Sequence, residues 1–257
     1  MKNDPFTSHP SSPHYGKGVT RRRVRLTGEP GMVFAELEDH AHAMRLRLHH
    51  RDGRIVAIEP DFHRYPLTAC AGATEPLQML VGEPVGQDAR TFFSGGRARR
   101  NCTHMFDLAW LASRHALRGN VQRLYSVDIP DAPDDRMEVI VDCDGAELLR
   151  LVVEAGVIQS PPLFAGRHLF RGFVSWINET DALGEAEIEA AMIVQKVVLI
   201  QPARRYQLPA GPVVDPEKSA VAGACHSYAP ERIEHAERRA GAVRDFSDRP
   251  EELLRFL

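Results

Sequence analysis

The fold class of this chain is decided by MRLRLHHRDGRIVAI, residues 44–58. The first part alternates apolar and polar residues, which is the period of a strand with one face toward water. Asp52-Gly53 then supplies the two-residue turn that matches strand twist, and the apolar residues after it return as a partner strand. This stretch therefore predicts a β-hairpin.

A second stretch with the same pattern covers residues 137–153, with Asp144-Gly145 as its turn. Helical spacing of apolar residues predicts one helix that begins after Asn101, which we expect to be the N-cap, and a longer helix over residues 181–200. Together these elements predict an α+β fold in which antiparallel β-hairpins are packed with helices.

Domain boundaries are expected where apolar periodicity is lost. Residues 1–18 are rich in polar residues and proline, and we expect a disordered tail. Residues 128–135 hold two prolines and four acidic residues, which suit an exposed link. We therefore expect an α+β domain over residues 19–127, and a second α+β half over residues 128–257 that packs on it.

Composition and charge limit the classes of partner. The chain has 257 residues and a net charge of -3, so it has no strong field to attract nucleic acid. The longest apolar run, residues 190–200, is shorter than the roughly 20 residues that span a bilayer. Residues 1–18 lack the apolar block of a secretory signal, so we expect a cytoplasmic protein. A small-molecule substrate is the expected partner, with no nucleic acid and no membrane, and a homo-oligomer is compatible with the sequence.

Cysteine and histidine residues between positions 61 and 104 form the first candidate site. Cys102 and His104 flank one residue in the first turn of a predicted helix, where unpaired amides and the helix dipole favour a thiolate. Cys70 lies upstream with Asp61 and His63, where a strand gives way to a helix. Zinc and iron take thiolate and imidazole ligands readily. We therefore predict a zinc or iron site of Cys70, Cys102 and His104, completed by His63 or Asp61.

Two other interpretations use the same residues without a metal. Cys102 is a candidate nucleophile, and His104 is a candidate general base oriented by Asp107, three positions later on the same helix face. Alternatively, Cys70 and Cys102 are small buried core residues and His104 is a core histidine with its hydrogen bonds satisfied. The sequence leaves these alternatives open.

The C-terminal half holds a second pair of cysteine and histidine. Cys225 and His226, with Tyr228, lie just ahead of Pro230, which can start a helix. We expect Cys225, His226 and Tyr228 to supply proton transfer or to close a pocket from the C-terminal half. The three arginines at positions 21–23 are expected to lie on a solvated strand edge. The alternative is that they bind a phosphate or a carboxylate.

Several motifs resemble the uncharacterised bacterial family DUF2889. They are a hairpin followed by a cysteine, Leu80-Val81-Gly82 at a helix exit, and Cys102-Thr103-His104 at a helix start. FVSW at residues 173–176 and ACHSYAPER at residues 224–232 fit as well, so the resemblance is expected from about Thr20 onward. Asn101 stands where the family usually has glycine. The resemblance implies no activity.

Met44 to Leu117 also resembles the NifU/SufU iron-sulfur scaffold fold. There a strand delivers one cysteine ligand and a later helix begins with another, and Cys70 and Cys102 take these positions. The additional scaffold cysteine is not evident in this chain. The resemblance implies a NifU/SufU-like topology for the first half.

These observations favour a metal-dependent enzyme of bacterial small-molecule catabolism. Non-redox lyase or hydratase chemistry on a carbonyl or phenolic substrate suits it, because no Gly-rich nucleotide-binding motif is seen. The alternative is a non-enzymatic metal or iron-sulfur carrier or scaffold that acts through a protein partner. A third interpretation is a ligand-binding module whose cysteines are core residues.

Overall fold

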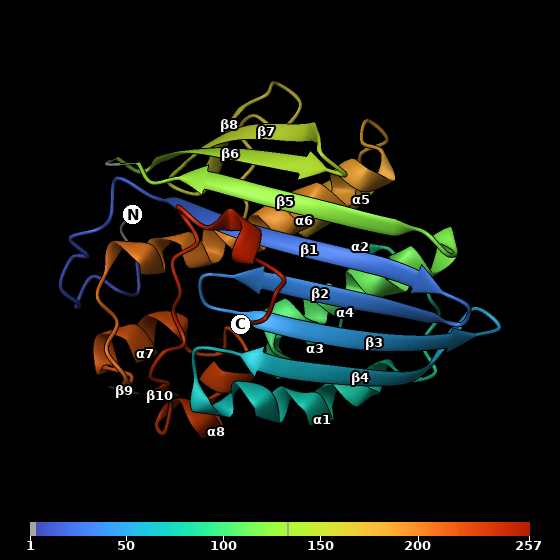
Figure 1. Cartoon of the computed structure of the whole chain (residues 1–257), viewed down its shortest axis with the longest axis horizontal. Coiled ribbons are helices and arrows are strands. Elements are labelled where there is room, and N and C mark those ends of the chain that lie inside the picture. The colour runs from blue at the N-terminus through green and yellow to red at the C-terminus, as the bar shows by residue number, and fades with distance from the viewer. Residues whose placement is uncertain (1–3, 133) are drawn as a thin grey trace.

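The computed structural model describes residues 4–132 and 134–257. Its centre is an eight-stranded antiparallel sheet with the strand order β4-β3-β2-β1-β5-β6-β7-β8 (Figure 1). The strands are β1 (Val19–Glu29), β2 (Met32–Asp39), β3 (Ala43–Arg51), β4 (Arg54–Arg64), β5 (Gln122–Pro130), β6 (Arg136–Cys143), β7 (Ala146–Glu154) and β8 (Val157–Ser160). The expected α+β fold of antiparallel hairpins and helices is confirmed.

The helices follow the two runs of strands. They are α1 (Thr74–Leu77), α2 (Ala89–Phe92), α3 (Arg97–Arg100), α4 (Thr103–His115), α5 (Phe173–Glu179), α6 (Glu185–Ile200), α7 (Asp215–Val221) and α8 (Pro230–Ile233). Short 3-10 turns are η1 (Thr68–Ala73), η2 (Gln78–Leu80), η3 (Ala116–Arg118), η4 (Gln201–Arg205), η5 (His226–Tyr228) and η6 (Pro250–Glu252), and β9 (Gly211–Pro212) pairs with β10 (Glu237–Arg238).

Both predicted hairpins are confirmed. Asp52 and Gly53 join β3 to β4 with φ angles of 49° and 72°. Asp144 and Gly145 join β6 to β7 with φ angles of 53° and 85°. Two consecutive residues with positive φ twist the backbone in the sense that strand pairing requires, and Asp-Gly tolerates this conformation.

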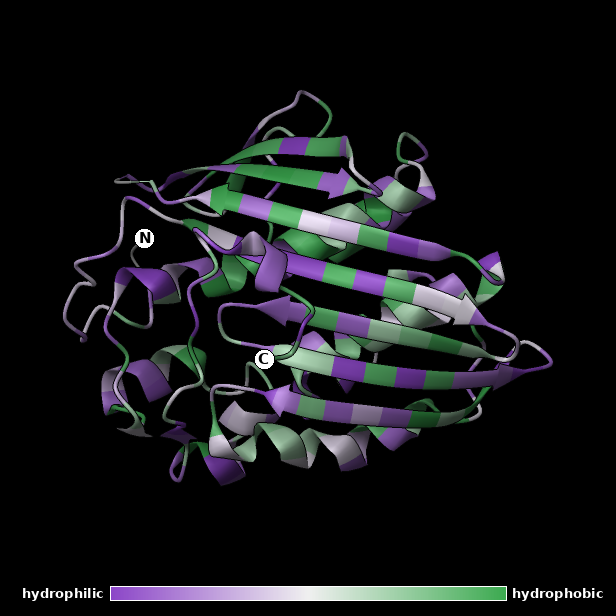
Figure 2. Cartoon of the chain, viewed as in Figure 1, coloured by the Kyte–Doolittle hydropathy of each residue, from purple (hydrophilic) through white to green (hydrophobic). Residues whose placement is uncertain are grey.

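The core lies on the face of the sheet that α4 and α6 cover, behind the strands in Figure 1. Burial alternates along several strands, as in β1, where Thr20, Arg22, Val24 and Leu26 are buried and the residues between them are not. Figure 2 shows the same alternation as hydrophobic and hydrophilic bands along the strands. The opposite face is polar because the side chains between the buried ones point there.

β1 joins the two predicted halves into one sheet. It pairs with β2 along one edge and with β5 along the other, in a register that starts with Val19 opposite Pro130. The expected boundary between residues 127 and 128 therefore falls inside β5. Buried residues of both halves belong to one continuous hydrophobic cluster.

Two helix starts differ from the prediction. Cys102, not Asn101, is the N-cap of α4, because the Asn101 side chain donates to the carbonyl of Arg97 at 3.0 Å and closes α3 instead. The long helix begins at Glu185 rather than at residue 181. Its start is fixed by Glu187, whose carboxylate accepts from the Gly184 amide at 2.7 Å.

Segments near both ends of the chain pack on this framework. Tyr15 donates to the carbonyl of Ala132 at 3.0 Å and accepts from Gln201, just beyond α6. The C-terminal segment crosses the polar face of the sheet in front of β1 and β2 (Figure 1), where the Leu254 amide donates to Glu38 at 2.7 Å. Among the described residues, no helix has the length and apolar character needed to cross a membrane.

Candidate active site

A cavity of about 420 Å³ lies where β2 turns into β3. Its walls come from that turn, the start of α4, the residues after β4, the end of α6 and residues between 221 and 245. Most of its lining is apolar, and a few titratable side chains converge on it. Such a cavity is the usual form of a small-molecule site. Its titratable lining side chains include His40, His42, His104, Cys70, Cys102 and Tyr228.

The turn between β2 and β3 is organised by the Asp39 carboxylate, which is fully buried. One of its oxygens, Oδ1, accepts from the amides of Ala41 and His42, both at 2.8 Å. The same oxygen lies 3.1 Å from Nδ1 of His42. An aspartate that bonds to backbone amides two and three residues on holds a tight turn. This turn places His40 and His42 at the cavity wall.

Arg22 on β1 supports Asp39 from within the sheet. Its Nε and Nη2 atoms donate to Oδ2 of Asp39 at 2.9 and 2.5 Å, and Arg22 is only 1% exposed. The expected solvated edge is therefore wrong for Arg22, although its neighbours Arg21 and Arg23 do pair with Asp128 on the outer face. The pleat of the strand explains this difference, because successive side chains point to opposite faces.

His104 lies between Arg22 and His42. Nη2 of Arg22 is 3.2 Å from Nδ1 of His104, and the His104 ring stacks on the His42 ring with centroids 3.9 Å apart. A guanidinium only donates, so Nδ1 of His104 accepts and Nε2 carries the hydrogen. Burial and the nearby His42 and Arg22 lower the pKa of His104 well below its ordinary value. His104 is therefore a neutral imidazole with one N–H.

His40 completes the group of imidazoles. Both of its ring nitrogens are buried, and neither has a hydrogen-bond partner among the described residues. Burial, reinforced by the positive charges of Arg204 and Arg22 and opposed by Asp39, lowers the pKa of His40 to about 4. Unpartnered buried polar atoms are costly, and their presence at a cavity wall is typical of groups that meet a ligand.

The expected thiolate at Cys102 is contradicted. Burial raises the pKa of Cys102 far above its ordinary value, and it raises the pKa of Cys70 to about 11. At Cys102, the start of α4 does not offset the loss of water around the sulfur. Ser227 instead donates a hydrogen bond to the Cys70 sulfur at 3.3 Å. Both thiols are neutral lining groups of the cavity.

The expected pairing of His104 with Asp107 is not formed. The Asp107 carboxylate has no hydrogen-bond partner among the described residues, and its nearest cation is Lys196, with Nζ 3.7 Å from Oδ1. Burial, partly offset by Lys196, raises the pKa of Asp107 to about 6. The side chain that fixes His104 is Arg22, which approaches from β1.

The residues predicted to complete a metal site lie elsewhere. Asp61 and His63 are exposed on β4, and the His63 ring packs edge-on against Phe256 with centroids 5.8 Å apart. Neither lines the cavity with Cys70 and Cys102. Across residues 4–132 and 134–257, no three histidine, cysteine or acidic side chains are grouped so that they could hold a metal ion. The zinc or iron site stays a prediction that this arrangement does not support.

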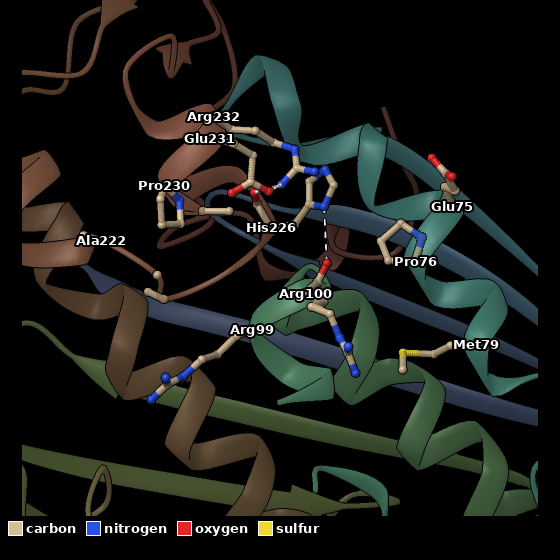
Figure 3. Close-up of a pocket in the computed structure, with 13 residues that line it drawn as sticks. Glu75, Pro76, Met79, Arg99, Arg100, Ala222, His226, Pro230, Glu231 and Arg232 are labelled. Atoms are coloured by element: carbon tan, nitrogen blue, oxygen red, sulfur yellow. Dashed lines mark hydrogen bonds and ion pairs between the residues drawn. The ribbon is translucent and has the colours of Figure 1, made fainter. Parts of the chain in front are cut away.

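Cys225, His226 and Tyr228, the predicted C-terminal site residues, are divided between two hollows. Cys225 and Tyr228 line the cavity, and burial raises the pKa of Tyr228 well above its ordinary value. The Tyr228 hydroxyl lies 3.4 Å from Glu217. His226 instead faces a separate cleft, where its Nδ1 atom is 3.3 Å from the carbonyl of Arg100 (Figure 3).

One family model matches part of the chain, and its description names no activity. Residues 25–118 match the family model described as "Protein of unknown function (DUF2889)". The matched residues include the turn with His40 and His42 and all of α4, whereas the two later motifs of the resemblance lie beyond them. No curated protein matches the chain, and the NifU/SufU likeness finds no support. Residues 25–118, about a third of the chain, are thus similar to the DUF2889 family.

Proposed function

We propose that this protein is a lyase of the hydratase type that moves protons on a small, largely apolar carbonyl compound. One observation carries the proposal. His42 and His104 stack at the wall of an apolar cavity, and their hydrogen bonds prepare them for opposite roles. One imidazole is arranged to accept a proton, and the other is arranged to donate a hydrogen bond.

His42 is the proposed general base. Asp39 accepts from its Nδ1 atom, so the lone pair is on Nε2, which makes no hydrogen bond with any described residue. A carboxylate at Nδ1 orients the ring and stabilises the imidazolium that forms when Nε2 takes a proton. Asp39 itself is held by Arg22 and by two backbone amides. The base is therefore fixed before a substrate arrives.

His104 is the proposed electrophile. Because Arg22 donates to its Nδ1 atom, the hydrogen on Nε2 is free to bond to a carbonyl oxygen. A neutral imidazole in this role stabilises the negative charge that develops on that oxygen when His42 removes the neighbouring proton. The lowered pKa of His104 keeps it neutral across the physiological range.

A 3-hydroxy carbonyl compound would react in two linked proton transfers. His42 takes the proton from the carbon next to the carbonyl, the electron pair forms the double bond, and the carbon–oxygen bond at the next carbon breaks. The departing hydroxide takes a proton from Tyr228 and leaves as water. The proton on His42 then returns to Tyr228. The raised pKa of Tyr228 keeps its hydroxyl protonated for this step.

Proton exchange in deuterated water tests the proposal without knowledge of the natural substrate. We expect the protein to exchange the proton next to the carbonyl of short 3-hydroxy and unsaturated carbonyl compounds, as followed by NMR. His42→Asn should reduce the exchange rate by about 10²-fold or more, since general bases contribute this much. His49→Asn is the matched control, because His49 lies on β3 outside the cavity. Unchanged exchange in His42→Asn would contradict the assignment.

The metal-dependent mechanism and the carrier role stay predictions, and no specific contact favours them. The guanidinium of Arg22 beside His104 opposes a second cation at this position. Metal analysis of untagged protein tests the predicted zinc or iron. Stoichiometric metal that is lost in Cys102→Ala would favour it, and a transferable iron-sulfur cluster would favour the carrier.

A further inference from the structure

A second hollow, a cleft of about 950 Å³, opens beside the cavity (Figure 3). Three segments that are far apart in the sequence form it. They are the start of α1 with η2, the end of α3, and residues 222–232 around η5. Its volume is at the upper end of the range for small-molecule sites, so it has room for a ligand of nucleotide size.

Positive charge without a carboxylate partner distinguishes this cleft. Arg99 and Arg100 of α3 are exposed, and among the described residues neither forms an ion pair. Nη2 of Arg100 has only a hydrogen bond to the Gly95 carbonyl at 3.3 Å. An unpaired guanidinium offers several donors in a fixed plane, which suits the oxygens of a phosphate.

The other charges of the cleft leave these two arginines available. Arg232 is 2.5 Å from Glu231, so this pair is neutral overall. Glu75 lies away from both Arg99 and Arg100 in Figure 3. Arg99 and Arg100 point to different sides in Figure 3, so each would contact its own phosphate group, and neither guanidinium faces a carboxylate there.

Apolar surface faces the same cleft. Pro76, Met79, Ala222 and Pro230 contribute it, and Figure 3 shows Pro76 and Met79 on one side with Pro230 and Ala222 on the other. A ligand that only carried phosphate would not use this surface. A nucleotide would, because the flat face of its base can pack against apolar side chains.

The cleft and the cavity share a wall. Ala224 lines both hollows, Cys225 faces the cavity, and the next residue, His226, faces the cleft. His226 also packs closely on η1, since a Cβ on Gly72 would lie 2.9 Å from its ring. One short segment thus separates the proposed reacting groups from the unpaired arginines.

We propose that the cleft binds the nucleoside diphosphate end of a carrier whose short acyl group, linked as a thioester, occupies the cavity. This inference rests on the proposed function and names its substrate class. A thioester makes the adjacent carbon more acidic than a free carboxylate does, because the acyl group then carries no negative charge. Phosphate contacts at Arg99 and Arg100 hold the carrier while His42 and His104 act on the acyl group.

Calorimetric titration of the whole protein with ADP tests the phosphate site without any turnover. We expect binding that weakens about tenfold or more for each arginine removed, so about 100-fold in Arg99→Ala/Arg100→Ala. Both side chains are exposed, so the double variant keeps its fold. Arg171→Ala is the matched control, because Arg171 is exposed outside the cleft. No ADP binding, or equal binding by the double variant, overturns the proposal.

A second titration tests the two-part assignment. The S-butyl thioether of coenzyme A, an unreactive carrier that contains a nucleoside diphosphate, should bind about tenfold or more tightly than coenzyme A itself, because the two ligands differ only in the butyl group, which the cavity would bury. Equal affinity for the two ligands would overturn the assignment of the acyl end to the cavity. His42→Asn should retain ADP binding. The phosphate site and the proposed proton transfer can therefore succeed or fail independently, and the two assays report on them separately.

Discussion

Asp39→Asn is the sharpest test of the buried network behind the cavity. Asp39 is inaccessible and accepts from the guanidinium of Arg22, from the His42 ring and from two amides. An asparagine replaces one carboxylate oxygen with an NH₂ group that cannot accept from Arg22. Arg22 is 1% exposed, so its charge would remain buried without a counterion. Breaking such a pair costs about 3–5 kcal/mol of unfolding free energy.

Asp128→Asn is the matched control, because Asp128 also pairs with arginines of β1. Its partners are Arg21 and Arg23 on the outer face, and the Asp128 side chain is 29% exposed. Solvent screens that interaction, so we expect a loss of about 1 kcal/mol or less. Urea unfolding followed by circular dichroism measures both variants. Thermal midpoints should fall by about 10 °C for Asp39→Asn and by only a few degrees for the control.

The pH dependence gives an independent check. Burial raises the pKa of Asp39, but the charges of Arg22 and His42 outweigh burial and hold that pKa well below its ordinary value. A carboxyl with a lowered pKa stabilises the fold fully above its unfolded pKa, about 4, and loses that contribution as the pH falls further. The stability gap between wild type and Asp39→Asn should stay constant from pH 8 to 5 and shrink below about pH 4. Equal losses in Asp39→Asn and Asp128→Asn, or a gap that widens in acid, would refute the reasoning.

Three other predictions follow from the buried titratable groups. The His40 ring should remain neutral in NMR titrations down to about pH 5. Because its folded pKa of about 4 lies below its unfolded pKa of about 6.5, the free energy of unfolding should fall as the pH drops from about 6.5 to about 4. The Asp107 carboxyl should titrate near pH 6, and Lys196→Met should move that midpoint upward, because Lys196 is the largest influence that lowers it; a midpoint near 4 would contradict this. At pH 8, iodoacetamide should modify Cys102 and Cys70 far more slowly than it does in urea, as measured by mass spectrometry, and fast labelling of folded protein would indicate thiolates.

Short-range sequence patterns were sufficient to predict the two hairpins. Asp52-Gly53 and Asp144-Gly145 determine their own backbone conformation, and the flanking alternation fixes which side chains are buried. The pairing of β1 with β5 had no such signal. These strands are separated by about a hundred residues, and their register depends on the packing of the whole sheet.

The candidate site was predicted only in part. Cys70, Cys102, His104, Cys225 and Tyr228 do line one cavity, as their residue types suggested. Asp39, His40 and His42 were missed because they lie in a break between two alternating stretches, where no periodic pattern draws attention to them. Two histidines and an aspartate within four residues were a usable signal. The stacking of His42 on His104 brings together residues 62 positions apart, which spacing does not reveal.

Protonation was the weakest part of the sequence interpretation. The position of Cys102 at a helix start suggested a thiolate, but its sulfur is buried and its pKa rises. Burial depends on residues that are distant in the sequence, such as those between 221 and 245, which close the cavity. A rule based on neighbouring residues alone therefore gives the wrong sign.

The origin of the cavity walls also bears on how the protein is made. All eight strands of the sheet precede residue 161, whereas the residues that close the cavity lie mostly beyond residue 198. A growing chain would therefore complete its strands before it holds the residues that shield His42 and His104 from water. A chain that stops after α6 would contain all strands of the sheet but would lack the residues between 203 and 245 that shield His42 and His104 from water.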